Sequence, residues 1–134
     1  MMAPGDGSMP VVVIADDDAD IRHLVGVAAR RAGASVGAIV SDGAAALQAI
    51  RSIRPDLAIL DVSMPEMSGL EVCRSLRLDP KTAATRVMLL SAAVHPEAIN
   101  AGSDAGADLY VQKPFSPRSL AGQIEGLLAA ERVR

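Results

Sequence analysis

Acidic side chains follow two short apolar runs of the sequence, where they could do metal and phosphoryl chemistry. Asp61 comes directly after the run 57–60, and Asp16 and Asp17 come directly after the run 11–15. Apolar runs this short and this rich in aliphatic residues predict buried parallel strands. If both strands belong to one sheet, their carboxylates converge at its carboxyl edge. Clustered carboxylates repel one another, so either some hold protons or a cation binds.

A divalent ion with oxygen ligands, Mg²⁺ above all, would satisfy such a cluster. Asp61 stands alone at its strand end, apart from the acidic run 16–18, so it is the carboxylate expected to attack a phosphoryl group. The product of that attack is an aspartyl phosphate, a covalent intermediate that transport ATPases also form. Phosphoryl transfer depends mostly on positioning and on neutralising the charge of the phosphoryl oxygens.

Short strands and amphipathic helices alternate along the chain, and these elements must position the acidic residues. Strands are expected at 10–15, 35–40, 56–60, 86–91 and 108–112, and helices at about 18–32, 42–53, 68–77, 96–104 and 117–131. The second helix is expected to be capped by Asp42 or Ser41 and to face inward with Ala46, Ile50 and Ile53. Five such units predict an α/β fold with an open parallel sheet and helices on both faces.

Open parallel sheets place their sites outside the carboxyl ends of the strands. The polar residues at or just past the predicted ends are Asp16, Asp17, Asp61, Ser91 and Lys113. Lys113 would supply positive charge to a transferring phosphoryl group, and Ser91 would supply a hydrogen bond. Polar residues from four different strands are therefore expected to meet at one edge.

The totals exclude several classes of protein. At 134 residues the chain suits one domain, expected at 9–131, with a tail or cloning remnant at 1–8 that is expected to be disordered and a second tail at 132–134. A net charge of −3 without a basic stripe argues against direct nucleic-acid binding. The single cysteine excludes an internal disulfide and fits a reducing, cytoplasmic location. No apolar run approaches the roughly 20 residues of a membrane span, and no signal peptide is visible.

Four stretches of the sequence resemble the receiver domain of two-component response regulators. They are 13–22, 55–69, 87–92 and 106–115, in the order and at the separations of that family. The resemblance covers about residues 9–131. It implies a flavodoxin-like (βα)5 fold, which is a doubly wound, parallel, five-stranded sheet in the order 2-1-3-4-5.

The resemblance also implies roles for the acidic residues. Asp61 would accept a phosphoryl group from a phosphohistidine on a histidine kinase or a phosphotransfer protein. Asp16 and Asp17 would hold Mg²⁺ together with Asp61 and the backbone carbonyl of Ser63. The protein would catalyse only its own phosphorylation and dephosphorylation, so it is not expected to be an enzyme in the usual sense.

Three further residues would connect the phosphoryl group to an output. By the same resemblance Ser91 would donate a hydrogen bond to a phosphoryl oxygen, Lys113 would pair with it, and Tyr110 would be an aromatic switch. The implied function is a signalling switch that changes the face formed by the fourth helix, fifth strand and fifth helix for an unknown downstream effector. No contact with nucleic acid or membrane is expected, and the oligomeric state is expected to be a monomer or weak dimer.

The resemblance also bears on how long an aspartyl phosphate would last. In related receivers, the side chains two residues after the acceptor and two after the hydroxyl residue influence the hydrolytic water. Those positions are Ser63 and Ala93 here, and neither side chain suits the orientation or activation of a water. We therefore expect slower self-dephosphorylation than in receivers with an amide and an acid at these positions.

Three alternative functions were weighed. A phosphatase of the haloacid-dehalogenase type also uses an Asp nucleophile, but it requires an acid where Ser63 stands. A flavodoxin-like cofactor binder requires a phosphate-cradling loop after the first strand, where three aspartates stand instead. A degenerate receiver would act as a phosphorylation-independent binding module, but it would lack Asp61, the acidic pair or Lys113. Since no output module follows residue 131, the chain is expected to be either a stand-alone receiver or part of a longer protein.

Overall fold

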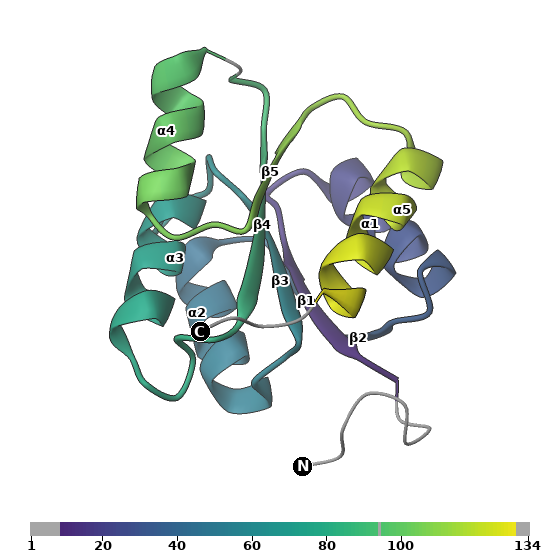
Figure 1. Cartoon of the computed structure of the whole chain (residues 1–134), viewed down its shortest axis with the longest axis horizontal. Coiled ribbons are helices and arrows are strands. Elements are labelled where there is room, and N and C mark those ends of the chain that lie inside the picture. Colours follow the sequence, from purple (N-terminus) through teal and green to yellow (C-terminus); the bar gives the residue numbers. More distant parts are fainter. Residues whose placement is uncertain (1–8, 94, 131–134) are drawn as a thin grey trace.

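The computed structural model describes residues 9–93 and 95–130, in which five strands and five helices alternate (Figure 1). The strands are β1 (Val11–Ala15), β2 (Ser35–Val40), β3 (Leu57–Asp61), β4 (Arg86–Ser91) and β5 (Leu109–Gln112). The helices are α1 (Ala19–Arg31), α2 (Gly43–Ile53), α3 (Gly69–Leu78), α4 (Pro96–Asp104) and α5 (Pro117–Ala129). Every expected element is present with similar bounds. The tails expected at 1–8 and 132–134 lie outside the described residues.

All five strands run parallel in the order β2-β1-β3-β4-β5, as expected. Helices α1 and α5 cover one face of the sheet, and α2, α3 and α4 cover the other (Figure 1). Because both faces are covered, the central strand β3 is buried at every residue, and its sequence is almost entirely apolar. Among the described helices, none is both long and apolar enough to cross a membrane.

Alternate residues of the central strands pack into two separate cores. Val12 and Ile14 of β1 pack on the side of α1 and α5, and Val13 packs on the side of α2 and α3. The inward face predicted for α2 was wrong at one position, since Ile53 is 37% exposed whereas Leu47 is buried. Ile53 is the last residue of α2 and lies against Gly37 of β2, which is the edge strand of the sheet.

Two aspartates fix the beginnings of the strands at the amino edge of the sheet. The amide of Asp56 donates to the Val11 carbonyl, and the Asp56 carboxylate accepts from the Val11 amide, both at 2.8 Å. Asp108 makes the same pair of hydrogen bonds with Val87, at 2.9 and 2.8 Å. Each carboxylate satisfies an amide that would otherwise lack a partner at a strand end. These contacts fix the register that brings the opposite ends of the strands together.

Side chains cap the beginnings of all five helices. The capping residues are Asp18, Asp42, Ser68, His95 and Ser116 for α1 to α5 in order. Asp42 is one of the two residues predicted to cap α2, and its Oδ1 accepts from the Ala45 amide at 2.7 Å. His95 was not predicted to cap α4, and its Nδ1 accepts from the Ala98 amide at 3.2 Å. The caps fix where each helix leaves the carboxyl edge of the sheet.

Candidate functional site

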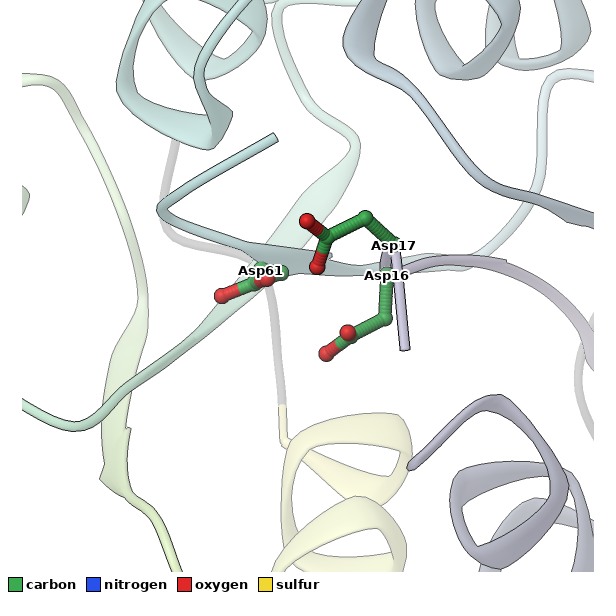
Figure 2. Close-up of side chains that lie close together, drawn as sticks. All are labelled: Asp16, Asp17 and Asp61. Carbon is green, nitrogen blue, oxygen red and sulfur yellow. The ribbon is translucent and has the colours of Figure 1, made fainter. Parts of the chain in front are cut away.

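Three carboxylates gather where β1 and β3 end (Figure 2). The register pairs Ala15 of β1 with Leu60 of β3, which sets the next residues, Asp16 and Asp61, beside each other. Oxygen atoms of Asp16, Asp17 and Asp61 all lie within 4.8 Å of one another. Asp16 is fully buried, Asp61 is 5% exposed and Asp17 is exposed. The cluster is therefore buried at Asp16 and Asp61 and open to solvent at Asp17.

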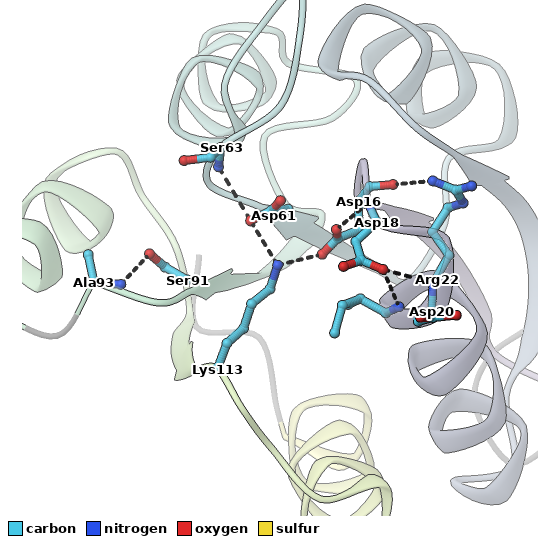
Figure 3. Close-up of polar contacts among 10 residues, drawn as sticks. Asp16, Asp18, Asp20, Arg22, Asp61, Ser63, Ser91, Ala93 and Lys113 are labelled. Carbon is cyan, nitrogen blue, oxygen red and sulfur yellow. Dashed lines mark hydrogen bonds and ion pairs between the residues drawn. The ribbon is translucent and has the colours of Figure 1, made fainter.

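Lys113 bridges the two buried carboxylates from the end of β5. Its Nζ lies 2.9 Å from Asp16 Oδ2 and 3.3 Å from Asp61 Oδ1 (Figure 3). The Lys113 amide donates to the Ser91 carbonyl at 2.8 Å, which fixes the loop that carries it to the end of β4. Three ionised carboxylates and one ammonium group leave two net negative charges in the cluster. A divalent cation would balance that charge.

Burial and charge set the protonation of the central pair. Burial and, to a smaller extent, the charge of Asp16 raise the pKa of Asp61, whereas Lys113 and the Ser63 amide oppose the rise, and the balance of these effects brings the pKa to about 6. Burial alone would lower the pKa of Lys113, but its hydrogen bond to Asp16 and the nearby carboxylates outweigh this and raise it above its usual 10.5. At neutral pH Lys113 is charged and Asp61 is mostly ionised, as a nucleophile must be.

Asp16 is held rigidly by its surroundings. Its Oδ1 accepts from the Asp18 amide at 2.9 Å, and its backbone carbonyl accepts from Arg22 Nη1 at 2.8 Å. Its Oδ2 is buried, and beyond the Lys113 ion pair it receives no hydrogen bond from the described residues. No pattern in the sequence predicted this contact of Arg22, which reaches back from the first turns of α1 to the end of β1.

The residues present fit a magnesium ion. The three side chains offer only carboxylate oxygens, which are the ligands that Mg²⁺ prefers, and the exposed Asp17 leaves room for the waters that this ion keeps. The buried Asp16 Oδ2 accepts no hydrogen bond from the described residues, and a bound cation would satisfy this oxygen. Ser63 lies in the loop beside the cluster, and its amide donates to Asp61 Oδ1 at 3.4 Å.

Two glycines hold the loop that follows Asp61. A Cβ atom at Gly69 would lie 2.3 Å from the Asp61 carbonyl oxygen, and one at Gly43 would lie 2.0 Å from the Met67 carbonyl oxygen. The Gly43 amide also donates to the Pro65 carbonyl at 3.2 Å. Helices α2 and α3 thus begin directly against this loop. The role of Gly43 could not be predicted from the sequence, because its contact joins segments that are distant in the chain.

Ser91 and Tyr110 form a separate group at the same edge. Ser91 is buried at the end of β4, and its Oγ accepts from the Ala93 amide at 3.0 Å (Figure 3). The hydroxyl of Tyr110 donates to the Ala93 carbonyl at 2.8 Å. Ala93 therefore links the two side chains that the resemblance singled out. Among the described residues, neither side chain makes a hydrogen bond with the carboxylate cluster.

The fold and the site define a doubly wound α/β domain with an acidic, lysine-bridged site at the carboxyl edge of its sheet. Residues 12–125 match the response regulator receiver domain. The chain belongs to this family, as the four sequence stretches indicated.

Individual relatives agree with this assignment. The chain is 35% identical over 117 residues to the DNA-binding response regulator MtrA of Mycobacterium tuberculosis, covering 87% of this chain and 50% of MtrA. It is 38% identical over 117 residues to the transcriptional regulatory protein GltR of Pseudomonas aeruginosa, covering 87% and 48%. The chain thus spans about half the length of these curated relatives.

Solved structures of receivers have the same fold. The chemotaxis response regulator CheY4 of Vibrio cholerae is 31% identical with a TM-score of 0.83, and the match covers 90% of this chain and 99% of CheY4. A BeF3-activated DrrB receiver domain is 30% identical with a TM-score of 0.80, and the match covers 92% of this chain and all of that receiver-domain chain.

Proposed function

We propose that this chain is a phosphoryl-accepting signalling switch with Asp61 as the acceptor. The observation that carries the proposal is the position of Asp61, a nearly buried carboxylate 3.3 Å from the Lys113 ammonium group and beside two further carboxylates. This arrangement supports attack on a phosphoryl group, because the nucleophile is ionised and positive charge stands next to it. The donor would be a phosphohistidine on a histidine kinase or a phosphotransfer protein.

In the proposed reaction one Asp61 oxygen forms a bond to phosphorus while the bond between phosphorus and the histidine nitrogen breaks. Asp16 and Asp17 would hold Mg²⁺ with Asp61 and the Ser63 carbonyl. A bound Mg²⁺ would neutralise charge on the phosphoryl oxygens. Lys113 would pair with one of those oxygens as its contact with Asp61 is replaced.

The output would pass through Ser91 and Tyr110. Ser91 would donate its hydroxyl hydrogen to a phosphoryl oxygen, and movement of this residue would reach Tyr110 through Ala93, which is bonded to both. The face formed by α4, β5 and α5 would then favour one of two pre-existing states. BeF3 activation of the similar DrrB receiver is consistent with such a change.

The proposal also covers the location of the protein, its catalytic activity, its partners and its oligomeric state. We propose a cytoplasmic location and no catalytic activity beyond the chain's own phosphorylation and dephosphorylation. MtrA is a DNA-binding regulator about twice as long as the match, so DNA binding need not lie in the part similar to this chain. For this chain we propose a protein effector, no direct contact with nucleic acid, and a monomer or weak dimer.

The dependence on metal tests the proposed chemistry. Incubation with acetyl phosphate and Mg²⁺ should add one phosphoryl group to the protein, and excess EDTA should abolish the addition. Asp17→Ala should lose most of the Mg²⁺ affinity, because it removes the exposed ligand without opening the buried pair. Asp20→Ala is the matched control, since Asp20 is an exposed acid nearby on α1 that lies outside the cluster. Equal labelling with and without EDTA would contradict the proposal.

A further inference from the structure

The ring of Tyr110 lies between β5 and α4. Tyr110 packs against the core on the side of α2 and α3, and its hydroxyl donates to Ala93 in the loop that leads into α4. Ala93 in turn donates to Ser91. In this position one hydrogen bond holds the hydroxyl of the ring, and α4 packs along the edge of the ring.

Helix α4 has a glycine where it contacts the Tyr110 ring. Gly102 is the buried residue of α4. A Cβ atom placed there would lie 2.8 Å from Tyr110 Cδ2, 3.3 Å from Tyr110 Cε2 and 3.3 Å from Leu89 Cδ1. Real Cβ contacts are essentially never as short as the first of these, so any larger residue would have to displace the ring or the helix.

Nothing in the backbone requires a glycine at this position. The positive-φ glycines among the described residues are Gly33 and Gly106, and Gly102 is not one of them. Glycine inside a helix is less favourable than alanine, because it loses more conformational freedom on folding. In α5, by contrast, Gly122 and Gly126 have open space where a Cβ would lie. The contact with Tyr110 is therefore the physical reason for a glycine at 102.

We propose that Gly102 is a positioning residue for the Tyr110 switch: it leaves the space in α4 that Tyr110 needs in order to hold its hydroxyl on Ala93. This inference rests on the proposed function and deepens it. A methyl group at 102 shifts the ring away from that position, so it uncouples the α4 and β5 face from events at Asp61. It does not touch the carboxylate cluster or Lys113, so phosphoryl acceptance continues.

A double-mutant cycle tests the contact itself, without any phosphorylation. Gly102→Ala should lower the midpoint of denaturant unfolding in the wild-type background. In a Tyr110→Ala background the same substitution should raise it, because the ring is gone, the helix prefers alanine, and the remaining close contact is with the terminal Cδ1 of Leu89 at 3.3 Å, which can move into the space that the ring vacates. Gly126→Ala, the matched control, should raise the midpoint equally in both backgrounds. Destabilisation by Gly102→Ala that is the same with and without the ring would overturn the proposal.

A spectroscopic measurement tests the link to the switch. Tyr110 is the single tyrosine of the chain, so labelling with 3-fluorotyrosine gives a ¹⁹F signal from this residue alone. Addition of Mg²⁺ and beryllofluoride should move that signal in the wild type and equally in Gly126→Ala. In Gly102→Ala the signal should start at a different position and move by less than half as much, while acetyl phosphate still labels the protein.

The outcomes separate the two proposals. A full wild-type response in Gly102→Ala would overturn the role of Gly102 and leave the phosphoryl switch intact. A wild type that shows neither a beryllofluoride response nor phosphoryl labelling would overturn the proposed function, and the unfolding cycle would then still decide whether Gly102 positions the ring.

Discussion

Asp61 must satisfy two opposing conditions. It is nearly buried, which keeps competing water away from the acceptor, yet it must be ionised to act as a nucleophile. The Lys113 ammonium group at 3.3 Å makes ionisation possible at neutral pH, although burial and Asp16 still hold the pKa of Asp61 at about 6. The unmodified site is therefore under electrostatic strain, and this has a measurable effect on stability.

That strain predicts a pH-dependent effect of Asp61→Asn in the presence of EDTA. An Asp carboxyl has a pKa of 3.8 as its model value, and folding raises the pKa of Asp61 to about 6. Its contribution to stability is therefore fully present below the lower pKa and is lost as the pH rises through the higher one. Asp61→Asn should raise the free energy of unfolding by about 1–3 kcal/mol at about pH 7.5, and the gain should vanish near pH 4.

Denaturant unfolding at several pH values checks this prediction. Glu125→Gln is the control, because Glu125 is exposed on α5 away from the site, and its effect should stay within about 0.5 kcal/mol. An Asp61→Asn variant that is less stable than the wild type at neutral pH would show that Lys113 more than compensates for burial.

Ser63 and Ala93 give a second prediction at the scale of single residues. The Ser63 amide donates to Asp61 and the Ala93 amide donates to Ser91, so both residues lie in loops at the edge of the sheet that carries the acceptor. The double substitution Ser63→Asn/Ala93→Glu should shorten the lifetime of the phosphorylated protein several-fold, since the new side chains can orient and activate water. The decay of phosphorylated protein with time measures this. Decay that is equal or slower would show that these positions do not set the lifetime.

At the scale of whole elements, much of the fold could be predicted because its determinants are local. Short aliphatic runs marked the strands, and Asp42 marked a helix start that the structure contains. The inward position predicted for Ile53 was wrong, because a helical pattern does not reveal that the neighbouring strand is an edge.

The site was predictable in part for the same reason. Acidic residues at strand ends could be identified from the sequence, and the fold brings Asp16, Asp17, Asp61 and Lys113 together. The contacts of Arg22, Gly43 and Gly102 could not be identified, because each joins segments whose distance depends on the completed packing.

The hydrogen bonds of Asp56 at the amino edge of the sheet give a prediction at this scale. Asp56→Ala leaves the Val11 amide without its acceptor and loosens the junction of β1 and β3. It should lower the free energy of unfolding by about 1–3 kcal/mol. Glu125→Ala, which removes an exposed carboxylate of α5, should have little effect. If calorimetry gave the two variants the same midpoint, the Asp56 contact would not stabilise the fold.

At the scale of the whole molecule, the acidic residues have different roles at the amino edge and at the carboxyl edge of the sheet. Asp56 and Asp108 fix strand starts at the amino edge, whereas the acids Asp16, Asp17 and Asp61 at the carboxyl edge lie close enough together to hold a cation. The fold holds like charges together at one end, and it therefore should become more stable when a cation binds there.

Magnesium binding should accordingly raise the unfolding temperature of the wild type. At a Mg²⁺ concentration about ten times the dissociation constant, the gain in unfolding free energy should be about 1.4 kcal/mol. Asp17→Ala should lose most of this gain, and Asp20→Ala should keep it. Scanning calorimetry with and without Mg²⁺ checks the prediction, and an equal gain in Asp17→Ala would place the ion elsewhere.

The identity of the phosphorylated residue tests the central claim most directly. After incubation with acetyl phosphate and Mg²⁺, borohydride reduction converts an aspartyl phosphate to homoserine, which peptide mass spectrometry locates in the chain. The account predicts homoserine at position 61 in the wild type and no labelled acidic residue in Asp61→Asn. Homoserine at another aspartate, or undiminished phosphoryl uptake by Asp61→Asn, would contradict it.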